Sequence, residues 1–275
     1  MDRAALEQHI RDTPVEGSPA NMRAAFLALA QAGTVPDLPP QQEVGGCPGR
    51  WFGPGGKPIV WLHGGGYVFG GSDSHAAPAQ ALAGLTDRAV FVPDYPLAPE
   101  HPWPAQLTAA KAVVDAIGSC DLVGDSAGGH LALNIALKGI GQIGKLAVLS
   151  PNTDRSGQST TRVRNTPRDL MNDDAQDRRL SDMALGHLPD DDPAASPLYG
   201  DLSGLPPLLV TATTREVLLD DSLLLARNAA QQGATVTSMI LPDLFHMWHL
   251  WPDATPQAIE ILQSVAVHLG GAAGR

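Results

Sequence analysis

The sequence predicts an α/β fold in which a mostly parallel central sheet is covered by helices on both faces. Short apolar runs without polar alternation recur along the chain, and stretches with helical spacing separate several of them. Strands of that kind are buried on both faces, as in a parallel sheet between two layers of helices. The apolar runs are 59–62, 89–92, 122–123, 146–149, 208–210 and 236–241, and the helical stretches are 105–117, 127–138, 220–232 and 257–269.

Residues 1–45 are expected to form N-terminal cap helices and a linker. Helical spacing covers 2–11 and 19–32, and Ser18 followed by Pro19 is typical of a helix start. The Pro- and Gly-rich segment that follows has room for at most two short strands, at 42–44 and 50–52.

The rest of the chain, 46–275, is expected to form one larger domain. Residues 152–200 interrupt its alternation of strands and helices, so we interpret them as a cap insertion with one or two helices within 168–188. We interpret the acidity of this insertion as a solvated outer face rather than a surface that recognises a cationic substrate. Its nine acidic residues are Asp154, Asp169, Asp173, Asp174, Asp177, Asp182, Asp190, Asp191 and Asp192.

Composition excludes several classes of protein. The 275 residues are 43% hydrophobic and 17% charged, which is enough for a sizeable core. A net charge of −11 repels phosphate backbones and anionic headgroups, so neither nucleic acid nor a membrane is expected as a partner. The chain has neither a signal-peptide pattern nor an 18-residue apolar run. Because Cys47 and Cys120 are too few for a disulfide framework, we expect a cytoplasmic protein. We also expect a monomer or a homodimer.

A G-x-S-x-G motif at 124–128 directly follows the run 122–123 and opens the helical stretch 127–138. In this strand–turn–helix context the central serine, Ser126, is a candidate nucleophile. Flanking glycines suit a sharp turn that leaves no room for Cβ atoms, and the helix N-terminus favours developing negative charge. Asp125 is expected to hold the turn in place. The alternative is an ordinary Gly-rich βα turn.

Three consecutive glycines, Gly64, Gly65 and Gly66, come with His63 directly after the run 59–62. Such a loop lets backbone amides approach a reacting oxygen, which is typical of an oxyanion hole. The loop lacks the spacing of phosphate-binding and dinucleotide-binding motifs, so it does not indicate a nucleotide site. No cofactor is expected.

A nucleophilic serine needs a general base, and the base needs a group that orients it. His246 is the candidate base because it follows the run 236–241 and a turn-forming Pro-Asp pair. His249 makes an HxxH pair with it, but the sequence offers no third ligand at a metal-binding spacing, so no metal is expected.

Two acids could orient the base. Glu216 lies nearer the end of the run 208–210, whereas Asp220 sits where an Asp commonly caps the next helix. The spacing of the residues leaves both candidates open.

Taken together, these motifs resemble the hormone-sensitive-lipase-like branch of the α/β-hydrolases, the bacterial esterases with HGGG and GDSAG motifs. The resemblance covers about 58–269 and includes the segment 94–105 and Phe245-His246. It implies an α/β-hydrolase fold with a small helical cap. It also implies a serine carboxylic ester hydrolase that acts on small to medium acyl esters through an acyl-enzyme.

The resemblance also implies roles for residues. It places the catalytic triad on Ser126, Glu216 and His246. It places the oxyanion amides on Gly65, Gly66 and Ala127. The aromatic residues that flank the motifs are candidates to line the substrate pocket, and they are Tyr67, Phe69, Trp103 and Trp248.

The sequence departs from the family pattern in three ways. Pro96 stands where the family usually has Arg, so the ion pair of that Arg is expected to be absent. Glu216 stands where Asp is commoner, which keeps Asp220 as the alternative acid. The chain is short for the family, so we expect a compact cap and a more open or smaller acyl pocket.

Two alternative functions remain open. A lactonase, thioesterase or amidase would use the same triad on a different bond. A non-catalytic ligand receptor on the hydrolase fold is the other alternative, and the presence of His246 together with the complete HGGG motif argues against it.

Overall fold

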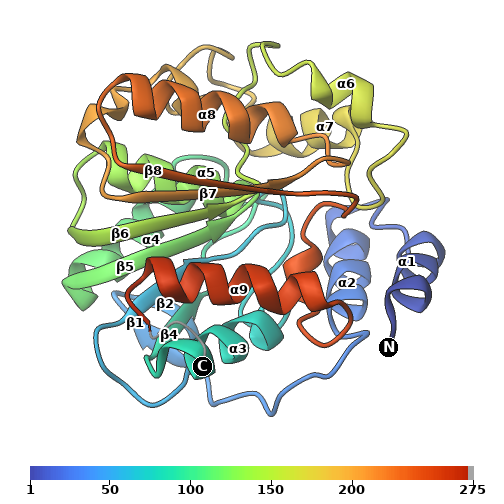
Figure 1. The fold of residues 1–275 in the computed structure, drawn as a ribbon, viewed down its shortest axis with the longest axis horizontal. Helices are drawn as coiled ribbons and strands as arrows, with labels where there is room; N and C mark the ends of the chain where they lie inside the picture. Colours follow the sequence, from blue (N-terminus) through green and yellow to red (C-terminus); the bar gives the residue numbers. More distant parts are fainter. Residues whose placement is uncertain (272–275) are drawn as a thin grey trace.

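Eight strands form a single sheet in the computed structural model, which describes residues 1–271 (Figure 1). The strands are β1 (Gln42–Val44), β2 (Cys47–Phe52), β3 (Ile59–Leu62), β4 (Val90–Pro93), β5 (Ser119–Asp125), β6 (Gln142–Leu149), β7 (Leu208–Thr213) and β8 (Val236–Leu241). Their order in the sheet is β1-β2-β4-β3-β5-β6-β7-β8. The pairings of β1 with β2 and of β2 with β4 are antiparallel, and the other pairings are parallel. The predicted mostly parallel sheet is confirmed.

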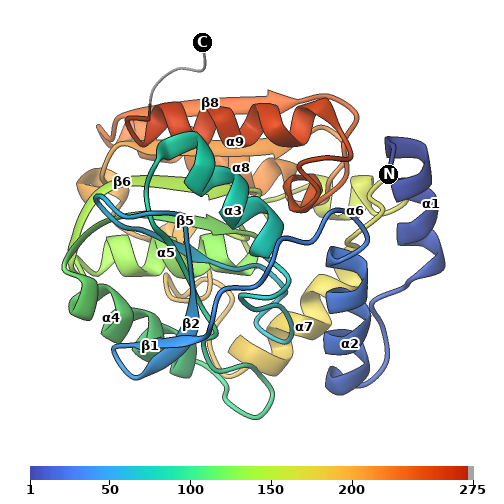
Figure 2. The ribbon, with the colours of Figure 1, turned by 90° about the horizontal axis from the view of Figure 1, so that it is seen from below.

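Helices cover both faces of this sheet, as predicted. Two helices lie side by side on one face and three cover the other (Figures 1 and 2), as right-handed crossovers between parallel strands require. No helix among residues 1–271 is long and apolar enough to span a membrane. The pair on one face is α3 (Ala76–Thr86) and α9 (Pro256–His268), and the opposite face carries α4 (Ala105–Ile117), α5 (Ala127–Leu137) and α8 (Leu219–Gln231).

Helix α3 was not predicted from the sequence. Its eleven residues, AAPAQALAGLT, contain a Pro and a Gly, and small alanines make up much of its buried face. Alanine gives little hydrophobic periodicity, so the amphipathic signal is weak.

Strand β5 extends beyond the apolar run at 122–123. The charged Asp121 precedes that run in the sequence, yet it is buried in the strand. Its carboxylate is paired with Lys57 and Arg88 at 2.6 and 2.7 Å, which allows a charged residue at this buried position.

Four more helices gather beyond the carboxyl ends of the parallel strands, where they form the cap (Figures 1 and 2). Ser18 caps the second of them, because its Oγ accepts a hydrogen bond from the amide of Asn21 at 3.3 Å. The expected domain boundary after residue 45 is wrong, since β1 already belongs to the sheet. The cap helices are α1 (Arg3–Asp12), α2 (Pro19–Ala30), α6 (Thr161–Asn165) and α7 (Asp174–Leu185).

The acidity of the insertion is only partly a solvated face. Asp182 and Asp190 are exposed, as expected, but Asp154 and Asp177 are buried. The buried guanidinium of Arg162 lies between Asp177 and Asp221 of α8, at 2.5 and 2.7 Å. A buried charge requires a partner. The ion pair of Arg162 with Asp221 attaches the insertion to a helix of the main domain, whereas its pair with Asp177 lies within the insertion.

Asp221→Ala is expected to destabilise the protein by about 3 kcal/mol, because it leaves the buried Arg162 with one partner fewer. It also removes the acceptor of the Thr153 and Asp154 amides, at 2.8 and 2.9 Å. Urea unfolding followed by circular dichroism measures the change. Asp191→Ala, at an exposed site of the insertion, is the control and is expected to stay within about 0.5 kcal/mol of wild type. Equal urea midpoints of unfolding for the two variants would contradict the role of Asp221 as a stabilising partner of Arg162.

Candidate active site

Ser126 lies in a sharp turn between β5 and α5. Its backbone has φ 53° and ψ −120°, a conformation that costs free energy in a residue with a side chain. The turn is held to β6, because the Ser126 amide donates to the Leu149 carbonyl at 2.9 Å. Gly128 permits the close approach of α5 to β3, since a Cβ there would lie 1.9 Å from the carbonyl oxygen of Leu62. The Ser126 side chain therefore projects at the N-terminus of α5.

The structure brings Ser126, His246 and Glu216 together. His246 Nε2 lies 2.9 Å from Ser126 Oγ, and His246 Nδ1 lies 2.8 Å from Glu216 Oε2. The second carboxylate oxygen of Glu216 accepts hydrogen bonds from Ser150 Oγ and the Thr213 amide, at 2.8 and 2.7 Å. These two bonds fix the carboxylate, so that it orients the imidazole with Nε2 toward the serine.

Asp220 does not reach the histidine. Its carboxylate accepts hydrogen bonds from Thr160 Oγ1 at 2.7 Å and from the Thr161 amide at 3.0 Å, which joins α8 to α6. Of the two acids that the sequence leaves open, Glu216 is therefore the one in contact with His246.

The surroundings of His246 favour its protonated form. Burial lowers the pKa of the imidazole, but the hydrogen bond and charge of Glu216, together with the charges of Asp169 and Asp125, outweigh burial. The pKa of His246 is consequently raised above its ordinary value. An imidazole in this setting is a strong base toward the Ser126 hydroxyl.

The HGGG loop presents backbone amides to the space beside Ser126. Gly65 has φ 117°, and a Cβ there would lie 2.2 Å from the carbonyl oxygen of Phe69. Within residues 1–271 the amides of Gly65 and Gly66 have no hydrogen-bond acceptor, and the amide of Ala127 lies in the first turn of α5, where no intrahelical acceptor exists. Unpaired donors of this kind suit an oxygen that becomes negative during a reaction.

His63 stabilises the HGGG loop and makes no hydrogen bond to Ser126. Its Nδ1 donates to the Gly64 carbonyl at 2.8 Å, and its ring stacks on Tyr95 with the centroids 4.0 Å apart. Burial and the neighbouring His75 lower the pKa of His63 to about 4, so it stays neutral at physiological pH.

A buried cluster of Asp125, His75 and His249 ties the serine turn to the HGGG loop. Asp125 accepts from Trp61 Nε1 at 2.8 Å, and the Nε2 atoms of His75 and His249 lie 3.3 and 3.6 Å from its carboxylate. Burial raises the pKa of Asp125, but the two histidines outweigh burial and hold it well below its ordinary value. The Gly64 amide also donates to His75 Nε2, at 3.3 Å.

The potential ligand atoms of this cluster lie within 4.8 Å of one another, as a metal ion would require. The Gly64 amide lies 3.3 Å from His75 Nε2, and one oxygen of Asp125 already accepts a hydrogen bond from Trp61 Nε1. These contacts fit a structural role for the cluster better than a metal centre. They agree with the expectation that Asp125 holds the turn, and they separate His249 from its HxxH partner His246.

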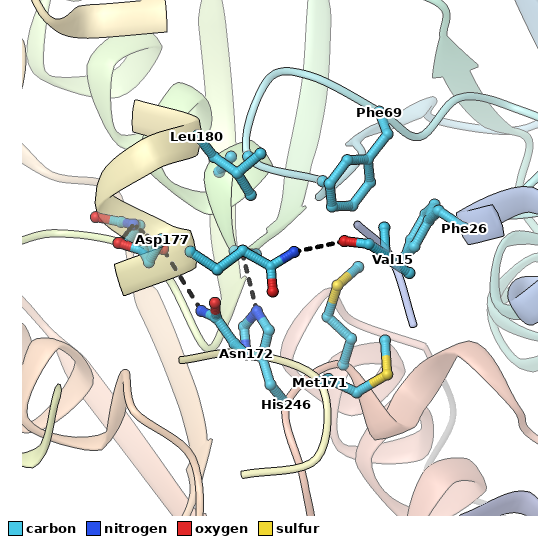
Figure 3. Close-up of a pocket in the computed structure, with 15 residues that line it drawn as sticks. Val15, Phe26, Phe69, Met171, Asn172, Asp177, Leu180 and His246 are labelled. Carbon is cyan, nitrogen blue, oxygen red and sulfur yellow. Dashed lines mark hydrogen bonds between the residues drawn. The ribbon is translucent and has the colours of Figure 1, made fainter. Parts of the chain in front are cut away.

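A cavity of about 460 Å³, including its mouth, opens beside Ser126 and His246. Figure 3 shows Phe26, Phe69 and Val15 on one side of it and Asp177 with Asn172 on the other. The cavity thus has an apolar side and a polar side. Its further side chains from the insertion are Asn152, Met171, Gln176 and Leu180, with Met247 beside His246.

Of the four aromatic residues expected in the pocket, only Phe69 lines this cavity. The expectation is wrong for Tyr67, Trp103 and Trp248, which are buried in the core. The Tyr67 hydroxyl lies 2.6 Å from His130 Nδ1, and Trp103 packs edge-on against the same imidazole. Proximity to a motif in sequence did not predict these positions, because the side chains point into the packed interior.

A cap residue makes an ion pair near Pro96, the position at which the sequence departs from the family pattern. Arg23 of α2 donates to the carboxylate of Glu100 at 3.0 and 2.6 Å. It also donates to the carbonyls of Val68 and Ala98, at 2.9 Å each. This arginine connects the cap to the segment that follows the HGGG loop.

Comparison with known proteins places this site in a family. The family model for the alpha/beta hydrolase fold matches residues 59–250. An acetyl-hydrolase of Streptomyces hygroscopicus is 31% identical over 286 residues, which cover 98% of this chain and 94% of the relative. An esterase of Acinetobacter venetianus is 32% identical, with 76% of this chain and 73% of the relative covered.

A solved structure also matches nearly the whole fold. The crystal structure of an esterase from the bacterial hormone-sensitive lipase family superposes with a TM-score of 0.90 and 27% identity, covering 98% of each chain. The chain belongs to the α/β-hydrolase family and, within it, to the hormone-sensitive-lipase-like bacterial esterases, which are carboxylic ester hydrolases.

Proposed function

We propose that this protein hydrolyses carboxylic esters with small to medium acyl groups through an acyl-enzyme on Ser126. The observation that carries the proposal is the continuous chain of contacts from Ser126 Oγ through His246 to Glu216, at 2.9 and 2.8 Å, beside an open cavity. A nucleophile, a base and an orienting acid in this geometry support acyl transfer.

The first half of the reaction forms the acyl-enzyme. His246 Nε2 takes the hydroxyl proton as Ser126 Oγ attacks the ester carbonyl carbon, and Glu216 stabilises the imidazolium that results. The carbonyl oxygen becomes negative and binds the amides of the oxyanion hole, each worth about 3 kcal/mol of barrier in comparable sites. The imidazolium then gives its proton to the leaving alcohol as the ester bond breaks. The amides are those of Gly65, Gly66 and Ala127.

Water completes the second half. His246 removes a proton from a water molecule, whose oxygen attacks the acyl carbon held on Ser126. The tetrahedral intermediate again binds the three amides. Its collapse returns the proton from His246 to Ser126 Oγ and releases the carboxylic acid, so that the enzyme is restored.

The cavity supports a substrate of limited size. Its apolar side, formed by Phe26, Phe69 and Val15, suits an acyl chain, and its volume suits a small ligand. The name of the Streptomyces relative, an acetyl-hydrolase, agrees with a small acyl group. The polar side, with Asp177 and Asn172, suits an alcohol portion that carries hydrogen-bond donors.

The alternatives have less support. A lactone, thioester or amide would react through the same atoms, and no contact in the cavity favours one of these bonds over an ester. A non-catalytic receptor has no need of the aligned contacts among Ser126, His246 and Glu216. A cytoplasmic monomer or homodimer stays a prediction.

Wild-type protein is expected to hydrolyse p-nitrophenyl acetate and butyrate, and Ser126→Ala to lower kcat by about 10⁵-fold or more, because the nucleophile is removed. Release of p-nitrophenol measures both. Across a series from acetate to octanoate, kcat/KM is expected to fall for the longest chains, because Phe26 and Phe69 bound the apolar side. Absence of turnover on every ester in the series would sink the proposal.

The acid is tested by comparing Glu216→Ala with Asp220→Ala. Loss of Glu216 is expected to lower kcat by about 10⁴-fold, because the imidazole loses its orienting partner. Asp220→Ala is expected to keep kcat within about threefold of wild type, since the Asp220 carboxylate accepts its hydrogen bonds from Thr160 and Thr161 of the α6 segment. Equal losses, or a loss only at Asp220, would refute the assignment of Glu216.

The dependence of kcat/KM on pH reports the ionisation of His246 in the free enzyme. Catalysis needs the neutral imidazole, and the raised pKa of His246 means that protonation begins at a higher pH than for an ordinary histidine. Activity is therefore expected to fall as the pH decreases, with a midpoint above 6.5. Initial rates with p-nitrophenyl butyrate at low substrate concentration give the midpoint, and a value below 6.5 would contradict the electrostatics described for this site.

A further inference from the structure

We propose that Asp169, a residue of the insertion, is a positioning residue for ester hydrolysis, which holds the loops of His246 and Glu216 together and places a second negative charge beside their ion pair. The inference rests on the proposed function of this site. Among the acidic residues of the insertion, none was expected from the sequence to contact the catalytic loops.

One carboxylate holds both loops. Asp169 Oδ1 accepts a hydrogen bond from the His246 amide at 3.0 Å, and Asp169 Oδ2 accepts one from the Val217 amide, also at 3.0 Å. Val217 directly follows Glu216 in the chain. The backbone of the base and the backbone of the acid are thus fixed to the same rigid group, which sets the position of one relative to the other.

The insertion makes further hydrogen bonds to the loop that carries Glu216. Asn165 Nδ2 donates to the carbonyl of Glu216 at 2.8 Å, and Arg215 Nε donates to the carbonyl of Arg168 at 3.2 Å. Asp169 Oδ1 also accepts from the amide of Met171, at 3.2 Å, which fixes the carboxylate within its own segment. Segment 165–171 therefore stabilises the positions of the loops that carry Glu216 and His246.

The charge of Asp169 acts on the same imidazole. His246 faces three carboxylates, namely Glu216 before α8, Asp169 in the insertion and Asp125 at the end of β5, and each of them raises its pKa. Asp169 in turn faces His246 and Glu216. Burial and the charge of Glu216 raise the pKa of Asp169 to about 6, against the effects of His246 and the two amides. Near pH 8 the carboxylate is therefore ionised.

A neutral replacement of Asp169 distinguishes a role in positioning the catalytic groups from a role in packing the insertion. Asp169→Asn has nearly the same shape, but it lacks the negative charge and retains only one oxygen for the two amides. Loss of the charge lowers the pKa of His246 and weakens the stabilisation of the imidazolium that forms when His246 takes the proton of Ser126. A residue that merely packed the insertion would change stability without moving that pKa.

The test measures kcat and KM for p-nitrophenyl butyrate, and the acid limb of kcat/KM, in wild type and Asp169→Asn. The variant is expected to lose about tenfold or more in kcat with KM within about twofold, because the stabilisation acts in the transition state. The midpoint of the acid limb is expected to move to lower pH by on the order of one unit. Asp191→Asn, an exposed acid of the same insertion, is the matched control and is expected to match wild type.

The other outcomes are also decisive. An unchanged midpoint in folded Asp169→Asn, or an unchanged kcat, overturns the inference while the wild-type activity leaves the proposed function intact. If Asp169→Asn does not fold, Asp169→Ser carries the same expectation for the midpoint. If neither folds while Asp191→Asn does, Asp169 serves the fold and the inference is overturned. A wild-type protein without esterase activity refutes the proposed function itself.

Discussion

The strained turn at Ser126 is the constraint on which the rest of the site depends. A residue other than glycine with φ 53° persists only where the surrounding structure determines the backbone conformation. Here the sheet does so, because the Ser126 amide donates a hydrogen bond to the Leu149 carbonyl of β6. Gly128 lets α5 lie against the carboxyl end of β3. Since the HGGG loop continues from that same end of β3, the nucleophile and the oxyanion amides are positioned by one packing contact.

From this turn, the other parts of the site come from the carboxyl ends of neighbouring strands. Ser150 follows β6, Glu216 follows β7 and His246 follows β8, and the parallel sheet brings these ends to one edge. Loops at a sheet edge need support, which the insertion provides. Arg162 attaches the insertion to α8, and Asp169 holds the loops of the base and the acid together. The cap thus shapes the cavity and also braces the catalytic groups.

Local sequence patterns were sufficient for the features that local geometry determines. The flanking glycines of Ser126 and the HGGG loop identify their turns, because these conformations exclude a Cβ. The choice between Glu216 and Asp220 was not local, since it depends on Ser150 and the Thr213 amide. Long-range contacts likewise explain the errors. The burial of Asp177 depends on Arg162, and the pocket side chains come from segments far apart in the chain.

Ser126 is expected to carry the acyl group during turnover. Acid quenching of the protein during hydrolysis of p-nitrophenyl butyrate, followed by peptide mass spectrometry, tests it directly. One butyryl group is expected on the peptide that contains Ser126, and none in Ser126→Ala. Turnover in wild type with no acyl group on Ser126, or with the acyl group on another residue, would contradict it.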